Sequence, residues 1–331
     1  MLLFYIHHKT LIHNMKTSSK ILILSVISLF LTGQATLMAQ DKTTLAKVGE
    51  SENPKAKLEK LTGYTQTYYF SEGAEARARS IADLMENAGR YFEKEIGFTP
   101  QTNLYILAPQ HWKDYAAKPL HEVYGFPHNI DYVNLAVASE DNDFWRSFLP
   151  PVDNLPAPLA ARVKKAYGKE DGTYSMMPFF DLLALHEMGH SYTSQAGLKM
   201  QRHWMSELFV NIMLHTYVAE QQPELLDALV TFPDMVVGAG SAEYKFTSLE
   251  DFEKLYSTMG MGPKNYGWYQ SRLHSAAKDI YNAGGKDAMV KLWNALKNHQ
   301  ETMTDEAFIT MLKTETHPAV AEVVTNWDNP R

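Results

Sequence analysis

The feature that most restricts the fold of this chain is a change in its hydrophobic pattern close to Gly172. Beyond that glycine, apolar residues recur at helical spacing through nearly all of the remaining sequence. The pattern predicts helices at 178–196, 207–220, 223–231, 249–258, 266–283, 286–298 and 305–314. No repeat of solenoid period accompanies them, so we expect a globular helical lobe rather than a helical array.

Upstream of Gly172 the pattern favours short strands around one long helix. Strand-like runs occur at 64–70, 104–108 and 132–138. A helix is predicted from Ala74 to Ile96, because Gly97 follows as a helix C-cap. Four prolines fall within 149–158, and they indicate a rigid loop.

Together these patterns predict an α+β fold. A mixed α/β N-terminal lobe is expected to carry a small sheet packed on the helix at 178–196, followed by a mainly helical C-terminal lobe. The predicted boundaries are 1–39 for a leader and signal peptide, 40–60 for a flexible lead-in, 61–196 for the α/β lobe and 197–331 for the helical lobe.

The start of the chain has the pattern of a secretory signal. Lys16 and Lys20 precede an apolar run from Ile21 to Leu31, and small and polar residues lead to a cleavage site after Ala39. The run is shorter than the roughly 20 apolar residues of a membrane-spanning helix, which favours a cleaved signal over an uncleaved anchor. We therefore expect an exported bacterial protein, periplasmic or extracellular, with no stable membrane span in the mature chain.

Charge and cysteine content exclude several kinds of partner and site. The net charge is −7 and no long basic run is present, which argues against nucleic acid as a partner. There are no cysteines, so the chain forms no disulfides and any metal must be held by histidine and carboxylate ligands. Nothing in the sequence marks an oligomer interface.

The predicted helix at 178–196 carries the motif His186-Glu187-Met188-Gly189-His190. His186 and His190 are one helical turn apart on the same face, so both imidazoles can reach a single ion. Glu187 lies at the edge of that face, where its carboxylate can act as a base on water without binding the metal. The alternative is a helix that carries two incidental histidines.

A third ligand is expected, because catalytic zinc commonly has three protein ligands and one open position. Glu207 is the candidate, 17 positions after His190 on the next amphipathic helix. The alternative is a first-turn glutamate favoured by the helix dipole. Asn211 is one turn further on the same face, where it either accepts a hydrogen bond from a ligand histidine or lies on the solvated helix surface.

The motif His186-Glu187-x-x-His190 with a glutamate on the next helix resembles the gluzincin metallopeptidases, which include thermolysin and a group of aminopeptidases. The segment from Trp204 to Val210 resembles the glutamate helix of the aminopeptidase-like members, in which a tryptophan, a short spacer and the glutamate are followed by apolar residues. The resemblance implies a Zn2+ cofactor on His186, His190 and Glu207, and a peptide or protein as the substrate.

The resemblance also implies a tyrosine, at the start of a later helix, that stabilises the oxyanion of the tetrahedral intermediate. Tyr269 is the candidate in this sequence and Tyr266 the second, while His274 is a further group that could assist. Ser271-Arg272 replaces the family's Lys-Gly pair, and the acidic strand motif that binds a free amino terminus is absent. The sequence therefore leaves endopeptidase and aminopeptidase activity open.

Three functions are consistent with these patterns. The leading one is a secreted zinc-dependent peptidase in which Glu187 activates the attacking water. The second is a zinc-binding but catalytically inactive protein of the cell envelope. The third is a helical interaction protein without metal. His203, His215 and His274 could contribute to the cleft but are expected to be ordinary core or surface histidines.

Overall fold

A mixed sheet of five strands forms one side of the molecule, in the order β1-β2-β3-β5-β4. The computed structural model describes residues 57–258 and 260–328. The strands are β1 (Glu59–Lys60), β2 (Thr67–Phe70), β3 (Asn103–Leu107), β4 (His128–Asn129) and β5 (Asn134–Ala138). Strands β2, β3 and β5 are parallel, whereas β1 and β4 run antiparallel to their neighbours at the two edges.

The central strands are short and largely apolar, as expected for parallel strands with both faces covered. In the register of β3 and β5, Leu104 lies opposite Leu135 and Ile106 opposite Val137. All four side chains are buried. The sheet therefore forms part of the hydrophobic core and provides a fixed edge at β4.

Helices make up most of the rest of the described chain. They are α2 (Glu75–Ile96), α3 (Pro109–Tyr115), α4 (Asp143–Arg146), α5 (Ala157–Tyr167), α6 (Met177–Gln195), α7 (His203–Gln221), α8 (Leu226–Gly238), α9 (Leu249–Leu255), α10 (Gly262–Asn298), α11 (Asp305–Glu315) and α12 (Pro318–Thr325). Short 3-10 turns lie at 120–122, 152–154 and 223–225. Gly285, with φ 56° and ψ −158°, breaks α10 into two helical parts.

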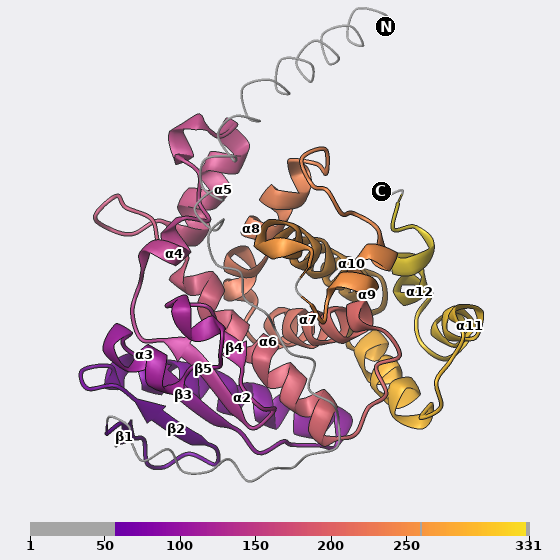
Figure 1. The fold of residues 1–331 in the computed structure, drawn as a ribbon, viewed down its shortest axis with the longest axis horizontal. Coiled ribbons are helices and arrows are strands. Elements are labelled where there is room, and N and C mark those ends of the chain that lie inside the picture. The colour runs from indigo at the N-terminus through magenta and orange to yellow at the C-terminus, as the bar shows by residue number, and fades with distance from the viewer. Residues whose placement is uncertain (1–56, 259, 329–331) are drawn as a thin grey trace, which may run out of the picture.

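Helix α6 lies between the sheet and the helical part of the molecule (Figure 1). On one side it contacts α2, β4 and β5, and on the other it contacts α7 and α8. Arg77 of α2 fixes this layer, because it donates to both carboxylate oxygens of Asp181 on α6 and to the carbonyl of Ala138 in β5. Helix α7 in turn packs along α10.

The α+β prediction is confirmed, with the sheet confined to the N-terminal part and helices throughout the C-terminal part. Of the expected lead-in at 40–60, residues 40–56 lie outside the described residues, and Glu59 and Lys60 pair with β2. The expected loop at 149–158 is interrupted by a 3-10 turn and ends where α5 begins, since Pro158 suits a first helical turn. The predicted signal peptide lies outside the described residues.

Candidate metal centre

Two histidines of α6 point toward the same place beside α7. His186 and His190 are four residues apart, and their ring centroids are 5.0 Å from each other. Helix α6 has buried residues on most of its circumference because the sheet covers one side and α7 the other. The imidazoles therefore lie largely inside the protein, where their ring nitrogens need hydrogen-bond or metal partners.

Glu207 of α7 meets both histidines. Its Oε2 is 3.3 Å from His186 Nε2, and its Oε1 is 3.7 Å from His190 Nε2. Glu207 is only 1% exposed, so this is a buried carboxylate against two imidazoles. Within the described chain these three residues are the only group of histidine, cysteine or acidic side chains with the geometry to hold a metal, their ligand atoms lying within 4.8 Å of one another.

The spacing of these atoms fits a small tetrahedral ion. Two ligands of such an ion, each about 2.1 Å from the metal, lie roughly 3.4 Å apart. Each imidazole has one oxygen of the Glu207 carboxylate close to that distance, since His186 Nε2 lies 3.3 Å from Oε2 and His190 Nε2 lies 3.7 Å from Oε1. Two imidazoles and one carboxylate also leave a coordination position open for water or substrate. The residues present therefore fit a metal ion that keeps one coordination position open.

Asn211 fixes the orientation of the first histidine. It is fully buried one turn after Glu207, and its Oδ1 lies 2.8 Å from His186 Nδ1. A carbonyl oxygen only accepts, so Nδ1 carries the proton and Nε2 keeps its lone pair. The lone pair is then available on the side of the imidazole that approaches Glu207.

Two further donors hold Glu207. The hydroxyl of Tyr256, just after α9, donates to its Oε1, and Nε2 of Gln270 on α10 donates to its Oε2 over 2.7 Å. Burial raises the pKa of the Glu207 carboxyl, but His190 and His186 outweigh it and hold the pKa well below its ordinary value. The carboxylate is therefore ionised at neutral pH, as a metal ligand must be.

Glu187 lies beside this cluster without being part of it. Burial raises the pKa of its carboxyl to about 7, His186 lowers it, Glu207 raises it, and a hydrogen bond from the backbone N–H of Asn129 lowers it. The Asn129 side chain also donates to the Glu187 carbonyl over 3.0 Å and to Ser191 Oγ over 3.2 Å. The edge strand β4 is thereby tied to the part of α6 that carries the motif.

The two candidate tyrosines have different surroundings. The hydroxyl oxygen of Tyr266 accepts a hydrogen bond of 2.8 Å from Gln270 Nε2, the same nitrogen that donates to Glu207. Burial and the carboxylates of Glu207 and Glu187 raise the pKa of Tyr266 well above its ordinary value. The structure thus brings Tyr266 close to the candidate metal ligands His186, His190 and Glu207.

The structure does not bring Tyr269 there. Its hydroxyl donates to the carbonyl of Ser248 over 2.7 Å, and its ring stacks on Trp327. Along α10, position 269 lies about 60° to one side of position 266 and position 270 about 40° to the other side. The structure turns the side of Gln270 toward Glu207 and the side of Tyr269 toward Ser248. Tyr269 therefore lies apart from His186, His190 and Glu207, and Tyr266 is the candidate tyrosine that reaches them through Gln270.

Three contacts of the site were not anticipated from the sequence, those of Tyr256, Gln270 and Asn129. The sequence could have indicated the contact of Gln270 with Tyr266, since Gln270 lies one turn after Tyr266 on the same helix. Tyr256 and Asn129 carried none, because their contacts with Glu207 and Glu187 join segments that are distant in the sequence.

Burial lowers the pKa of two further histidines, His274 and His215. His274 of α10 has its ring centroid 6.2 Å from that of His186, and burial, then His186 and His215, lower its pKa to about 3. Burial, then Lys278, lowers the pKa of His215 to about 4. His203, at the start of α7, stacks on Tyr256 with centroids 4.7 Å apart.

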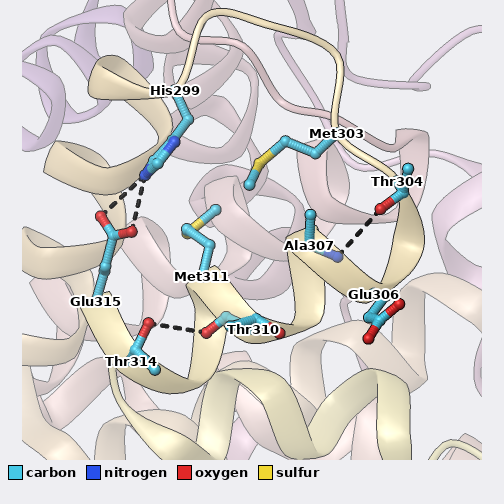
Figure 2. A pocket seen from close by; sticks show the side chains of 9 residues that line it. All are labelled: His299, Met303, Thr304, Glu306, Ala307, Thr310, Met311, Thr314 and Glu315. Carbon is cyan, nitrogen blue, oxygen red and sulfur yellow. Dashed lines mark hydrogen bonds and ion pairs between the residues drawn. The ribbon is translucent and has the colours of Figure 1, made fainter.

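A separate open pocket of about 360 Å³ lies along α11. Figure 2 shows its lining, in which His299 contacts the Glu315 carboxylate at 2.9 Å and Met303 and Met311 supply apolar surface. It includes no residue of the metal cluster, and its only histidine is already paired. The pocket is therefore separate from the candidate metal centre on α6 and α7.

No known protein family, curated protein or solved structure matches the chain. Among residues 57–258 and 260–328, none of the helices combines the length and apolar character needed to cross a bilayer.

Proposed function

We propose that the chain is an exported zinc-dependent peptidase, with zinc on His186, His190 and Glu207. The observation that carries the proposal is the meeting of these three side chains in one buried place, with a fourth, Glu187, beside them but outside the ligand set. A structural zinc site is usually closed by four protein ligands. Three ligands together with an adjacent free carboxylate suit hydrolysis better than a structural role.

The choice of zinc rests on the donor set. Two imidazole nitrogens and one carboxylate oxygen, with the first imidazole oriented by an amide, form the ligand set of many zinc hydrolases. When bound, zinc supplies a Lewis acid that makes water more acidic and polarises the carbonyl of the substrate.

Glu187 is the proposed general base. Its backbone is held by the Asn129 side chain and its carboxylate by the Asn129 N–H, so its position beside the ligands is fixed. It takes a proton from the attacking water as the new C–O bond forms. It then gives that proton to the leaving nitrogen as the C–N bond breaks, which balances the reaction.

Tyr266 is the proposed partner of the oxyanion. Its oxygen accepts from Gln270, and among the described residues no acceptor is found for its own hydrogen. That hydrogen is therefore available to the oxygen that becomes negative when water attacks the carbonyl. Tyr256 is less suited, since its hydroxyl already donates to Glu207.

A peptide substrate is supported by the sheet edge next to the site. Strand β4 is the last strand of the described sheet, and the Asn129 side chain contacts the Glu187 backbone. An extended peptide can bind such an edge through main-chain hydrogen bonds, which would place its backbone near the general base.

Export is supported by the signal-like segment at 1–39, with a periplasmic or extracellular location. Expression of the full sequence with a C-terminal tag, followed by N-terminal sequencing of the exported product, tests this. A mature chain that begins near residue 40 is the expected result. Retention of the whole segment would contradict the export proposal.

The function itself is tested by metal analysis and cleavage profiling of protein purified without chelator. The expected result is about one zinc per chain and cleavage of members of a mixed peptide library, with loss of cleavage after chelation. Stoichiometric zinc without cleavage would favour a catalytically inactive zinc protein of the envelope. Absence of bound metal would contradict both.

A further inference from the structure

Gln270 lies between Glu207, the carboxylate of the candidate metal site, and Tyr266, the proposed oxyanion donor. Its Nε2 lies 2.7 Å from Glu207 Oε2 and 2.8 Å from the hydroxyl oxygen of Tyr266. A side-chain amide nitrogen carries two hydrogens, so one N–H serves each partner. Both bonds point from Gln270 outward, toward groups that the proposed mechanism uses.

The other end of the amide is also held. Gln270 Oε1 accepts a hydrogen bond from Asn211 Nδ2 over 3.4 Å, and Asn211 Oδ1 lies 2.8 Å from His186 Nδ1. With Glu207 Oε2 3.3 Å from His186 Nε2, the four side chains form a closed ring from α6, α7 and α10.

The ring fixes which way the amide points. Turning Gln270 around would place its carbonyl oxygen against the Glu207 carboxylate and against Tyr266, and would turn its N–H groups toward Asn211. Two acceptors would then face each other in a buried place, which is costly. The arrangement with Nε2 on Glu207 is therefore the one that the neighbours impose.

This orientation of the Gln270 amide gives the two tyrosines near Glu207 different hydrogen-bonding roles. Tyr256 donates its hydrogen to the carboxylate, so its hydroxyl helps to hold the ligand. Tyr266 instead receives a hydrogen from Gln270, so its oxygen is satisfied while its own hydrogen stays available. An amide at position 270 produces this outcome, whereas a carboxylate there would take the Tyr266 hydrogen for itself.

We infer that Gln270 is a positioning residue that couples the metal ligand Glu207 to the hydroxyl of Tyr266. It orients the carboxylate toward the metal and keeps the Tyr266 hydrogen free for the oxyanion. The second half of this inference rests on the proposed peptidase function, while the first half depends only on metal binding.

The test uses two substitutions of similar size in the full mature protein. Gln270→Met removes both hydrogen bonds without adding charge. Gln270→Glu keeps the shape but leaves at most one hydrogen at position 270, shared with the neighbouring Glu207 carboxylate, so the Tyr266 hydroxyl is expected to donate to position 270. Gln221→Met, at the exposed end of α7, is the matched control.

The first measurement is zinc affinity by chelator competition, together with the absorption spectrum of the cobalt-substituted protein. Loss of a partner that orients a ligand typically lowers metal affinity by about 10- to 100-fold, and we expect Gln270→Met to fall in this range. The cobalt spectrum should change in Gln270→Met and stay as in the parent in Gln221→Met. Unchanged affinity and spectrum in Gln270→Met would overturn the metal half of the inference.

The second measurement is a double-mutant cycle on peptide cleavage. Tyr266→Phe should lower kcat of the parent strongly, with little effect on KM, but should cost little more in the Gln270→Glu background, where the hydrogen is already captured. Equal losses from Tyr266→Phe in both backgrounds would overturn the second half. A parent protein that binds zinc and cleaves no peptide would overturn the proposed function and the claim about the Tyr266 hydrogen. The zinc affinity of Gln270→Met would still decide whether Gln270 orients Glu207 for metal binding.

Discussion

Gly189 on α6 and Val210 on α7 lie against each other where the two ligand-bearing helices cross. A Cβ atom at position 189 would be 2.8 Å from the Val210 Cβ and 3.4 Å from its Cα. The Val210 backbone cannot give way without moving α7, so the missing side chain at Gly189 is what lets α7 bring Glu207 to the histidines.

Gly189→Ala is therefore expected to weaken both stability and metal binding. Overpacking of this kind costs about 1–3 kcal/mol, which exceeds the gain of about 1 kcal/mol from replacing a helical glycine with alanine. Urea unfolding and zinc competition measure the two effects. The matched control is Gly89→Ala in α2, where a Cβ meets nothing within 4 Å and stability should hold or rise. Equal behaviour of the two variants would contradict the close-approach account.

The tyrosine pair gives a second prediction. Tyr266→Phe removes the proposed oxyanion donor, so kcat should fall by about 100- to 1000-fold with little change in KM. Tyr269→Phe removes a hydrogen bond to Ser248, which should cost about 1 kcal/mol of stability and leave kcat near that of the parent. Steady-state kinetics on one cleaved peptide checks both. A large kcat loss in Tyr269→Phe alone would contradict the assignment.

A third prediction concerns the dependence of stability on pH. Burial, then Lys278, lowers the pKa of His215 from 6.5 to about 4. Between these values the unfolded chain binds more protons than the folded one, so His215 favours folding fully above pH 6.5 and progressively less as the pH falls toward 4.

Replacing His215 should make the free energy of unfolding depend less steeply on pH. In the middle of the window the parent should lose up to about 1.4 kcal/mol more per pH unit than His215→Leu. Urea unfolding of both proteins at several pH values between 4 and 7 measures the difference. Both chains share the other titrating groups, of which His274 interacts electrostatically with His215. Parallel curves would show that His215 is not held neutral by its surroundings.

The sequence predicted the residues whose relation is fixed within one helix. His186, Glu187 and His190 occupy one helix face by their spacing, and Glu207 and Asn211 share a face of the next helix for the same reason. The structure places all five together because α6 and α7 pack against each other.

Relations between distant segments could not be predicted in the same way. Helical periodicity placed Tyr266 and Tyr269 near the start of one helix but did not say which of their faces meets α7. Tyr256 reaches Glu207 from the end of α9, and Asn129 reaches Glu187 from a two-residue strand. Such contacts depend on loop paths, which carry no periodic signal.

The most direct test of the central claim is the rate of peptide hydrolysis by Glu187→Gln, measured with its zinc content. Glutamine keeps the size of the side chain but cannot take a proton from water. Because Glu187 is not among the ligands, the variant should retain about one zinc per chain while its hydrolysis falls by at least about 100-fold. A Glu187→Gln protein that cleaves peptides as fast as the parent would contradict the assigned mechanism.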